Sequence, residues 1–83
     1  MNRITIEVYV PAVQRSFDIH VPESMRLAEV TELVVNAMEQ LLDGLFTNSV
    51  TEALCDRVTG LQYDINLTVW EAGLKNGSRL MMI

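Results

Sequence analysis

Residues 4–10 and 15–21 alternate apolar and polar side chains with the two-residue period of a half-buried β-strand. In the first segment, ITIEVYV, the apolar positions are Ile4, Ile6, Val8 and Val10. In the second segment they are Phe17, Ile19 and Val21. Pro11, between the two segments, cannot continue a sheet ladder. The pattern therefore predicts two strands that pair as an antiparallel hairpin.

From Leu27 onward the apolar residues recur at spacings of three and four, the period of an amphipathic helix. The apolar stripe consists of Leu27, Val30, Val34, Ala37, Met38 and Leu41. The opposite side carries polar and acidic residues. Ser24 lies where a side chain can cap the helix, and Gly44 suits a left-handed C-cap. We predict a helix that ends near Gly44 and covers the apolar face of the hairpin.

Residues 45–59 lack a single clear period. They are consistent with a connecting loop followed by a strand at 53–58, or with a short helix through residues 50–54. We expect the loop followed by the strand. Thr59 and Gly60 would then turn the chain into a short strand at 61–64.

The C-terminal part predicts one helical turn, capped by Thr68 and ended by Gly73, then a polar turn at 75–78 and a last strand at 79–83. Because residues 80–83 are apolar at both alternating positions, this strand is expected at the centre of the sheet, beside the first strand. The order of elements predicts an α+β fold of the β-grasp type, a mixed sheet with one main helix packed across one face. Residues 1–83 would form a single domain.

Size and composition agree with one dense core, because 83 residues contain 49% hydrophobic side chains. The longest apolar runs are far shorter than the roughly 20 residues that cross a bilayer, and the N-terminus lacks the apolar stretch of a signal peptide. The single cysteine, Cys55, has no intramolecular disulfide partner and favours a reducing compartment. We expect a cytoplasmic protein that does not insert into a membrane.

The net charge of −5 argues against a nucleic-acid partner. Eleven acidic residues outnumber six scattered basic ones, so the chain cannot form the basic patch that neutralises phosphates. A protein or a basic peptide suits an acidic domain better. The alternative is that the charge only keeps the domain in solution.

The side chains that could carry catalysis or hold a metal lack partners in the sequence. His20 has only Asp18 as a same-face neighbour on its strand and is expected to be solvated. Cys55 has no nearby base and is expected to be a partly buried structural thiol. Trp70 is expected to fill the core beneath the one-turn helix rather than to stack on a ligand. We therefore predict no catalytic, cofactor-binding or metal-binding residue.

Alternation along the last strand predicts a contact surface. If Leu80 and Met82 point at the helix, the residues between and after them point to the outer face of the sheet, beside a tyrosine of the first strand. The predicted partner-binding set, named the outer-face cluster, is Tyr9, Arg79, Met81 and Ile83, with Glu7 at its edge. Exposed Met, Ile and Tyr side chains would form an adaptable patch. The alternatives are that segment 45–59 covers this surface, or that a second copy of the chain does.

Two stretches resemble ubiquitin-like proteins. SFDIHVPESMRLAEVTELV resembles the stretch that leads their second strand into the helix, and LTVWEAGLKNGSRLMMI resembles the end of their fold. In the latter the matching positions are Leu67, Trp70, Leu74, Leu80 and Met82. Within that superfamily, AGLKNGSRLMMI is most similar to the C-terminal pattern of the YukD/EsaB-like proteins of bacterial type VII secretion systems. The resemblance covers the chain except for residues 45–59.

The resemblance implies a cytosolic accessory or regulatory factor, without enzyme activity, of the machinery that exports WXG-type proteins. It implies a protein partner, either an FtsK-like ATPase or a membrane component of that apparatus. Conjugated ubiquitin-like proteins need a flexible tail ending in Gly-Gly, and this sequence ends in RLMMI, so conjugation is not expected. The alternatives are a ubiquitin-like adaptor of another bacterial pathway and, third, a relative of sulfur carriers or modifiers.

Overall fold

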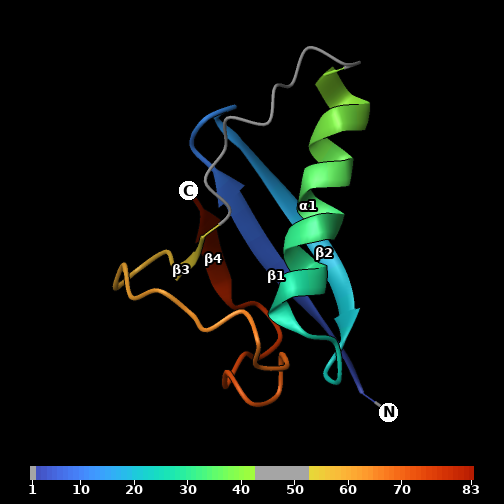
Figure 1. The fold of residues 1–83 in the computed structure, drawn as a ribbon, viewed down its shortest axis with the longest axis vertical. Helices are drawn as coiled ribbons and strands as arrows, with labels where there is room; N and C mark the ends of the chain where they lie inside the picture. The colour runs from blue at the N-terminus through green and yellow to red at the C-terminus, as the bar shows by residue number, and fades with distance from the viewer. Residues whose placement is uncertain (1, 43–52) are drawn as a thin grey trace.

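A computed structural model describes residues 2–42 and 53–83, which form a sheet with one helix across one of its faces (Figure 1). The elements, in chain order, are β1 (Arg3–Val10), β2 (Arg15–Pro22), α1 (Leu27–Leu42), β3 (Leu54–Asp56) and β4 (Arg79–Met82). The predicted helix end near Gly44 and most of the predicted loop lie outside the described residues. The predicted α+β fold, a mixed sheet with one main helix across one face, is confirmed.

The four strands lie in the order β2-β1-β4-β3. β1 pairs with β2 antiparallel and with β4 parallel, and β4 pairs with β3 antiparallel. The predictions of an N-terminal hairpin and of a central last strand beside the first are therefore confirmed. The hairpin turn closes through Val13 N–H donating to Val10 O at 3.2 Å, and Gln14 accommodates the turn with φ of 52°.

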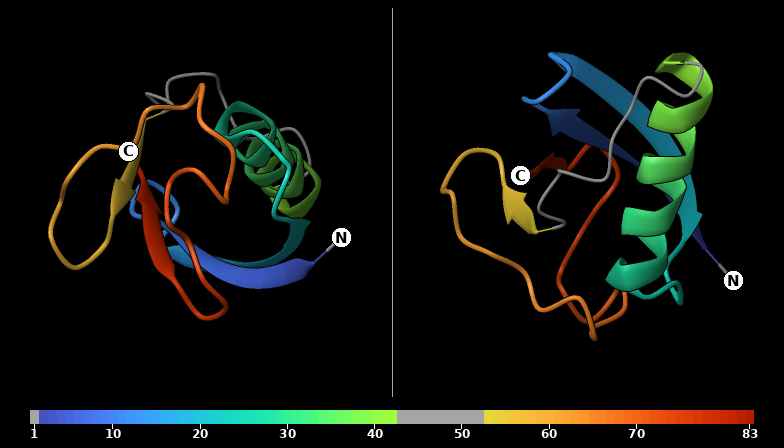
Figure 2. Two further views of the ribbon diagram at one scale, coloured as in Figure 1. Left: turned by 90° about the horizontal axis from the view of Figure 1, so that it is seen from below. Right: turned by 45° about the horizontal axis from the view of Figure 1, so that its top comes forward.

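The core lies between the sheet and α1 (Figure 2). Each strand of the central pair contributes alternate side chains to it, and α1 contributes one stripe. The fully buried members from these three elements are Ile6, Val8, Val10, Leu27, Val30, Val34, Met38, Leu80 and Met82. Leu80 and Met82 therefore face the helix as predicted, which turns the residues between and beyond them to the outer face.

β3 is shorter than the predicted strand at 53–58. The chain turns after Asp56 because its carboxylate accepts the N–H groups of Val58 at 2.7 Å and Thr59 at 3.0 Å. The predicted strand at 61–64 is also wrong, since that segment makes only an isolated bridge between Gln62 and Cys55. In the turn after β3, the Asp56 side chain thus accepts backbone N–H groups that would bond to a neighbouring strand if β3 were longer.

The start of α1 depends on a distant segment. Its first N–H groups, those of Leu27 and Ala28, donate to the carbonyls of Leu67 at 2.9 Å and Ile65 at 3.0 Å. The residue that precedes the helix is Arg26, two positions after the predicted cap at Ser24. Backbone carbonyls brought in by the tertiary structure thus satisfy the first two donors of α1.

Candidate protein-interaction surface

The outer-face cluster lies on the side of the sheet opposite α1. Tyr9 and Met81 are paired across β1 and β4 and are both half-buried. Arg79 is exposed, and Ile83, two residues beyond Met81, is 48% exposed. The structure therefore brings the four predicted residues onto one face, where apolar surface is open to contact.

Arg57 is an additional member of this face that the sequence did not indicate. Its guanidinium donates to a Glu7 carboxylate oxygen at 2.6 Å and lies 4.4 Å from the centroid of the Tyr9 ring. Its backbone N–H donates to Arg79 O at 3.1 Å, so the side chain runs from the end of β3 across β4 to β1. Part of the segment considered as a possible cover, residues 45–59, thus contributes the Arg57 side chain to this face.

Glu7 does not form its ion pair with the charged residue opposite it in the strand register. Glu7 and Arg79 are paired in register, yet Glu7 forms its ion pair with Arg57, and Arg79 has no ion-pair partner among the described residues. The Arg57–Glu7 pair is partly exposed, so it contributes at most about 1 kcal/mol to folding. Its larger effect is to fix a flat guanidinium over the tyrosine ring, beside the open part of the cluster.

The β2 side of the outer face is polar. His20 is exposed and lies opposite Thr5, whose hydroxyl is 3.0 Å from the histidine Nδ1. Asp18 lies opposite Glu7, so two acidic residues adjoin there. No group of three or more metal-ligating side chains occurs within residues 2–42 and 53–83. His20 thus lies on the exposed face, as predicted.

Cys55 is buried, 4% exposed, and lies opposite Met81 and Gln62. The thiol is thus more fully buried than the partial burial that the sequence predicted. Close by, the Tyr63 hydroxyl donates to the Asp56 carboxylate at 3.2 Å. Backbone N–H groups of Thr59 and Val58 lower the pKa of Asp56, whereas burial, and then the Asp56 charge, raise the pKa of Tyr63. These groups organise a turn.

The structure corrects the placement of Trp70. The indole is 70% exposed, and the neighbouring Val69 is fully buried in its place. Residues 68–73 form the predicted single turn, in which Ala72 N–H donates to Thr68 O at 2.9 Å, and Thr68 and Glu71 each accept the other's N–H through its side chain, at 3.1 Å and 2.9 Å. This reciprocal capping fixes which side chain points inward, and Val69 N–H, bound to Met25 O at 2.8 Å, ties that residue to the core.

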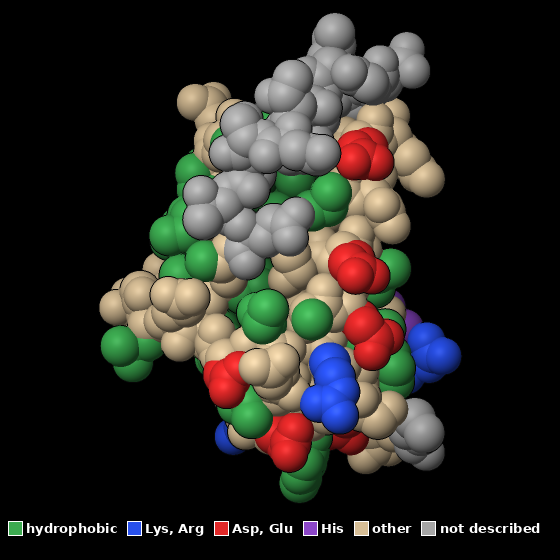
Figure 3. Space-filling view, in the orientation of Figure 1, with side chains coloured by type: hydrophobic (Ala, Val, Ile, Leu, Met, Phe, Trp, Pro, Cys, Tyr) green, Lys and Arg blue, Asp and Glu red, His purple; other side chains and the backbone are tan. Residues whose placement is uncertain are grey.

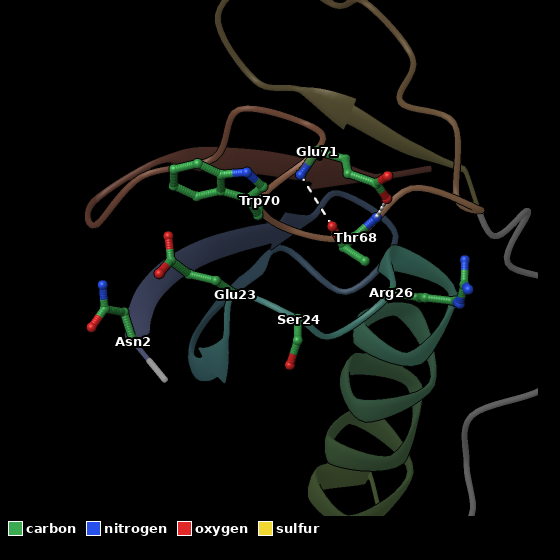
Figure 4. A pocket seen from close by; sticks show the side chains of 7 residues that line it. All are labelled: Asn2, Glu23, Ser24, Arg26, Thr68, Trp70 and Glu71. Carbon is green, nitrogen blue, oxygen red and sulfur yellow. Dashed lines mark hydrogen bonds between the residues drawn. The ribbon is translucent and has the colours of Figure 1, made fainter.

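The exposed indole lies between two adjoining surface hollows, both lined by Glu23, Trp70 and Glu71. Figure 4 shows the Glu23 carboxylate directed toward the indole, while the Glu71 carboxylate is on the other side, beside Thr68. The second hollow also reaches the core residues Ile4 and Leu74. This surface lies at the end of β1 opposite Tyr9, so it is separate from the outer-face cluster.

The exposed side of α1 is acidic, with Glu29, Glu32 and Glu39 all exposed, and Figure 3 shows the acidic side chains spaced along this side of the molecule. A partner that approaches along the exposed side of α1 would therefore meet negative charge. No helix within the described ranges is long and apolar enough to cross a bilayer.

No protein-family model matches the chain, and no curated protein matches its sequence. Similarity is found among solved structures. The ubiquitin-like domain of the Mycobacterium tuberculosis type VII secretion system protein EccD1 superposes with a TM-score of 0.72 at 15% identity, covering 100% of this chain and 99% of that one. A ubiquitin of Caldiarchaeum subterraneum gives 0.72 at 16% identity, covering 99% and 92%.

A third similar structure is a chain of the MycP5-free ESX-5 inner membrane complex, with a TM-score of 0.71 at 17% identity. It covers 100% of this chain and 21% of that longer chain. At these identities the similarity concerns the fold. The protein thus has the ubiquitin-like β-grasp fold, which it shares with ubiquitin-like domains of type VII secretion components.

Proposed function

We propose that this chain is a non-catalytic protein-interaction factor, an accessory or regulatory component of a bacterial type VII secretion system that acts in the cytoplasm. The observation that carries the proposal is the likeness to the EccD1 ubiquitin-like domain over nearly the full length of both chains. The similarity between AGLKNGSRLMMI and the YukD/EsaB-like C-terminal pattern supports the same assignment.

The interaction surface in this proposal is the outer-face cluster. Met81 offers a flexible, polarisable side chain and Ile83 a rigid apolar one, and Arg79 supplies a charge that no described carboxylate pairs. Arg57 borders the patch and fixes the Tyr9 ring. An apolar centre with charged residues at its edge matches the apolar core and polar rim of protein–protein interfaces.

The proposed partner is the FtsK-like ATPase or a membrane component of the secretion apparatus. The match to a chain of an inner membrane complex, in which a domain of this fold is one part of a much longer protein, supports a membrane-associated partner. A second copy of the chain on the same face is the competing occupant.

Replacing Ile83 with Glu tests the surface. The Ile83→Glu variant should recover the ATPase or membrane component at least about tenfold less well in a quantitative pull-down, because a charge is placed in the contact region. Leu33→Glu is the matched control, since Leu33 is 40% exposed against 48% for Ile83 but lies on α1, across the sheet. Circular dichroism verifies that both variants fold.

Equal recovery by the two variants would remove Ile83 from the interface. Recovery of an adenylating enzyme alone would contradict the secretion assignment and favour a sulfur carrier or modifier. Loss of self-association in Ile83→Glu, measured by sedimentation, would identify the second copy as the occupant.

The alternative function is a ubiquitin-like adaptor in another bacterial pathway. The Caldiarchaeum subterraneum ubiquitin gives the same TM-score as the EccD1 domain, so the fold alone does not distinguish a secretion role from another ubiquitin-like role. The same pull-down discriminates the two, since the adaptor would recover proteins unrelated to the secretion apparatus.

A further inference from the structure

Trp70 is an exposed aromatic residue on a fixed backbone. The backbone N–H of Trp70 donates to Glu23 O at 3.0 Å, and the backbone carbonyl of Trp70 accepts Gly73 N–H at 3.0 Å. Val69, on one side, is anchored in the core, and the reciprocal Thr68–Glu71 caps hold the turn. The indole therefore pays little ordering entropy when it contacts a ligand, unlike an aromatic residue on a loose loop.

The Glu23 carboxylate adjoins the indole, whereas the Glu71 carboxylate is turned away from the ring toward Thr68 (Figure 4). Glu23 lines both hollows, is directed at the ring, and has no ion-pair partner among the described residues (Figure 4). Glu71 lines both hollows as well, and the Thr68 N–H that its carboxylate accepts lowers its pKa, so it stays ionised at neutral pH. An aromatic face beside the Glu23 carboxylate, with the charge of Glu71 in the same hollows, favours a cation.

Two basic residues of the chain adjoin these hollows without filling this role. The Arg26 guanidinium donates to Asn66 O at 2.7 Å and points away from the indole in Figure 4. Lys75 lines only the second hollow. No guanidinium of the described residues stacks on Trp70, because the one cation–π pair among them is Arg57 on Tyr9.

That pair shows what the arrangement around Trp70 is suited to bind. At the other end of β1, a glutamate and an aromatic ring together hold one guanidinium, at 2.6 Å from Glu7 and 4.4 Å from the Tyr9 centroid. Glu23 and Trp70 supply the same two elements, a carboxylate and a larger aromatic face, on an open surface. A planar guanidinium can stack on the ring and form a charge-assisted bond to the carboxylate at once, which a lysine ammonium does less well.

We propose that Trp70 and Glu23, with Glu71 at the border, form a docking site for an arginine side chain presented by a protein partner. The site is distinct from the outer-face cluster and rests on the proposed function only in requiring that the partner be a protein. It gives the domain a second, charge-selective contact at the opposite end of β1.

Trp70 is the only tryptophan in the chain, so its fluorescence reports the site directly. The probe is acetyl-Gly-Arg-Gly-amide, with matched peptides that carry lysine or uncharged citrulline in place of arginine. The arginine peptide should change the fluorescence saturably, with a dissociation constant of about 1–10 mM. The lysine peptide should bind at least about threefold more weakly, and the citrulline peptide should give no saturable change. The indole N–H signal in ¹H–¹⁵N NMR spectra should shift with the same dependence.

Glu23→Gln should weaken the arginine peptide at least about fivefold, because it removes the charge and leaves the side-chain shape. Glu29→Gln, an exposed position on α1, is the matched control and should leave the affinity unchanged. Equal binding of arginine and citrulline peptides, equal effects of the two variants, or no saturation by either readout would overturn the site. Equal binding of arginine and lysine would overturn the arginine assignment. Because only peptides are used, failure here leaves the pull-down test of the secretion function intact.

Discussion

At the scale of single residues, Val69 and Trp70 show how strongly burial depends on one step along the chain. Hydrophobicity and size alone would place the tryptophan inside, yet the valine is fully buried and the indole is 70% exposed. The Thr68–Glu71 caps set the orientation of the turn, and the space beneath it holds a valine. A residue that stays exposed despite a large apolar surface is a candidate for contact with a partner.

Truncating these two neighbours should change the stability of the fold by very different amounts. Val69→Ala should lower the free energy of unfolding by about 2 kcal/mol, because it leaves a cavity in the core. Trp70→Ala should change it by about 0.5 kcal/mol or less, as expected for a surface position. Urea unfolding followed by circular dichroism measures both. A larger loss in Trp70→Ala than in Val69→Ala would show that the indole packs inside.

At the scale of elements, the turn after β3 shows how a polar side chain limits a strand. Asp56 accepts two backbone N–H groups and the Tyr63 hydroxyl, and its own carbonyl accepts Gly60 N–H at 2.8 Å. Gly60 takes φ of 77°, which favours glycine at this position. The turn thus ends β3 after three residues and directs Arg57 across the outer face.

Acid should loosen this turn through Asp56. The folded-state pKa of Asp56 is lowered below 3.8, chiefly by the N–H groups of Thr59 and Val58, so its stabilisation is fully present above that value and is lost as pH falls through the folded pKa. Asp56→Asn should therefore be less stable than the parent at pH 6, and the difference should shrink toward about pH 2. Urea unfolding across that range measures it. A difference that stays constant with pH would show that the charge of Asp56 does not matter.

At the scale of the whole molecule, the parallel pairing of β1 and β4 joins the two ends of the sequence at the centre of the sheet. β4 is only four residues long, but it is paired on both sides and carries two fully buried side chains. β3, at the edge, has three residues and one neighbouring strand. The last part of the chain therefore completes the core and also presents the outer-face cluster.

Hydrogen exchange should report this difference between centre and edge. Backbone N–H groups that bond within the sheet at residues 80–82 should exchange at least about tenfold more slowly than those at residues 54–56, because a central strand opens only when most of the fold does. Exchange followed residue by residue by NMR provides the measurement. Equal exchange rates in the two strands would mean that β4 opens locally while β1, β2 and α1 stay folded, which would contradict the central role of β4 in the core.

The sequence by itself determined the two-faced strands, the stripe of α1, the central place of β4 and the grouping of Tyr9, Arg79, Met81 and Ile83 on one face. The faces follow from local periodicity, because the direction of each side chain is fixed by its position in a strand or helix. The central place of β4 follows from its apolar residues at both alternating positions. Only the tertiary structure decided the length of β3, the exposure of Trp70 and the path of Arg57 to Glu7. Each of these features depends on residues that are far apart in the sequence but adjacent in the fold. Arg57 and Glu7, for example, are 50 positions apart in the chain. A local sequence pattern contains no information on such contacts.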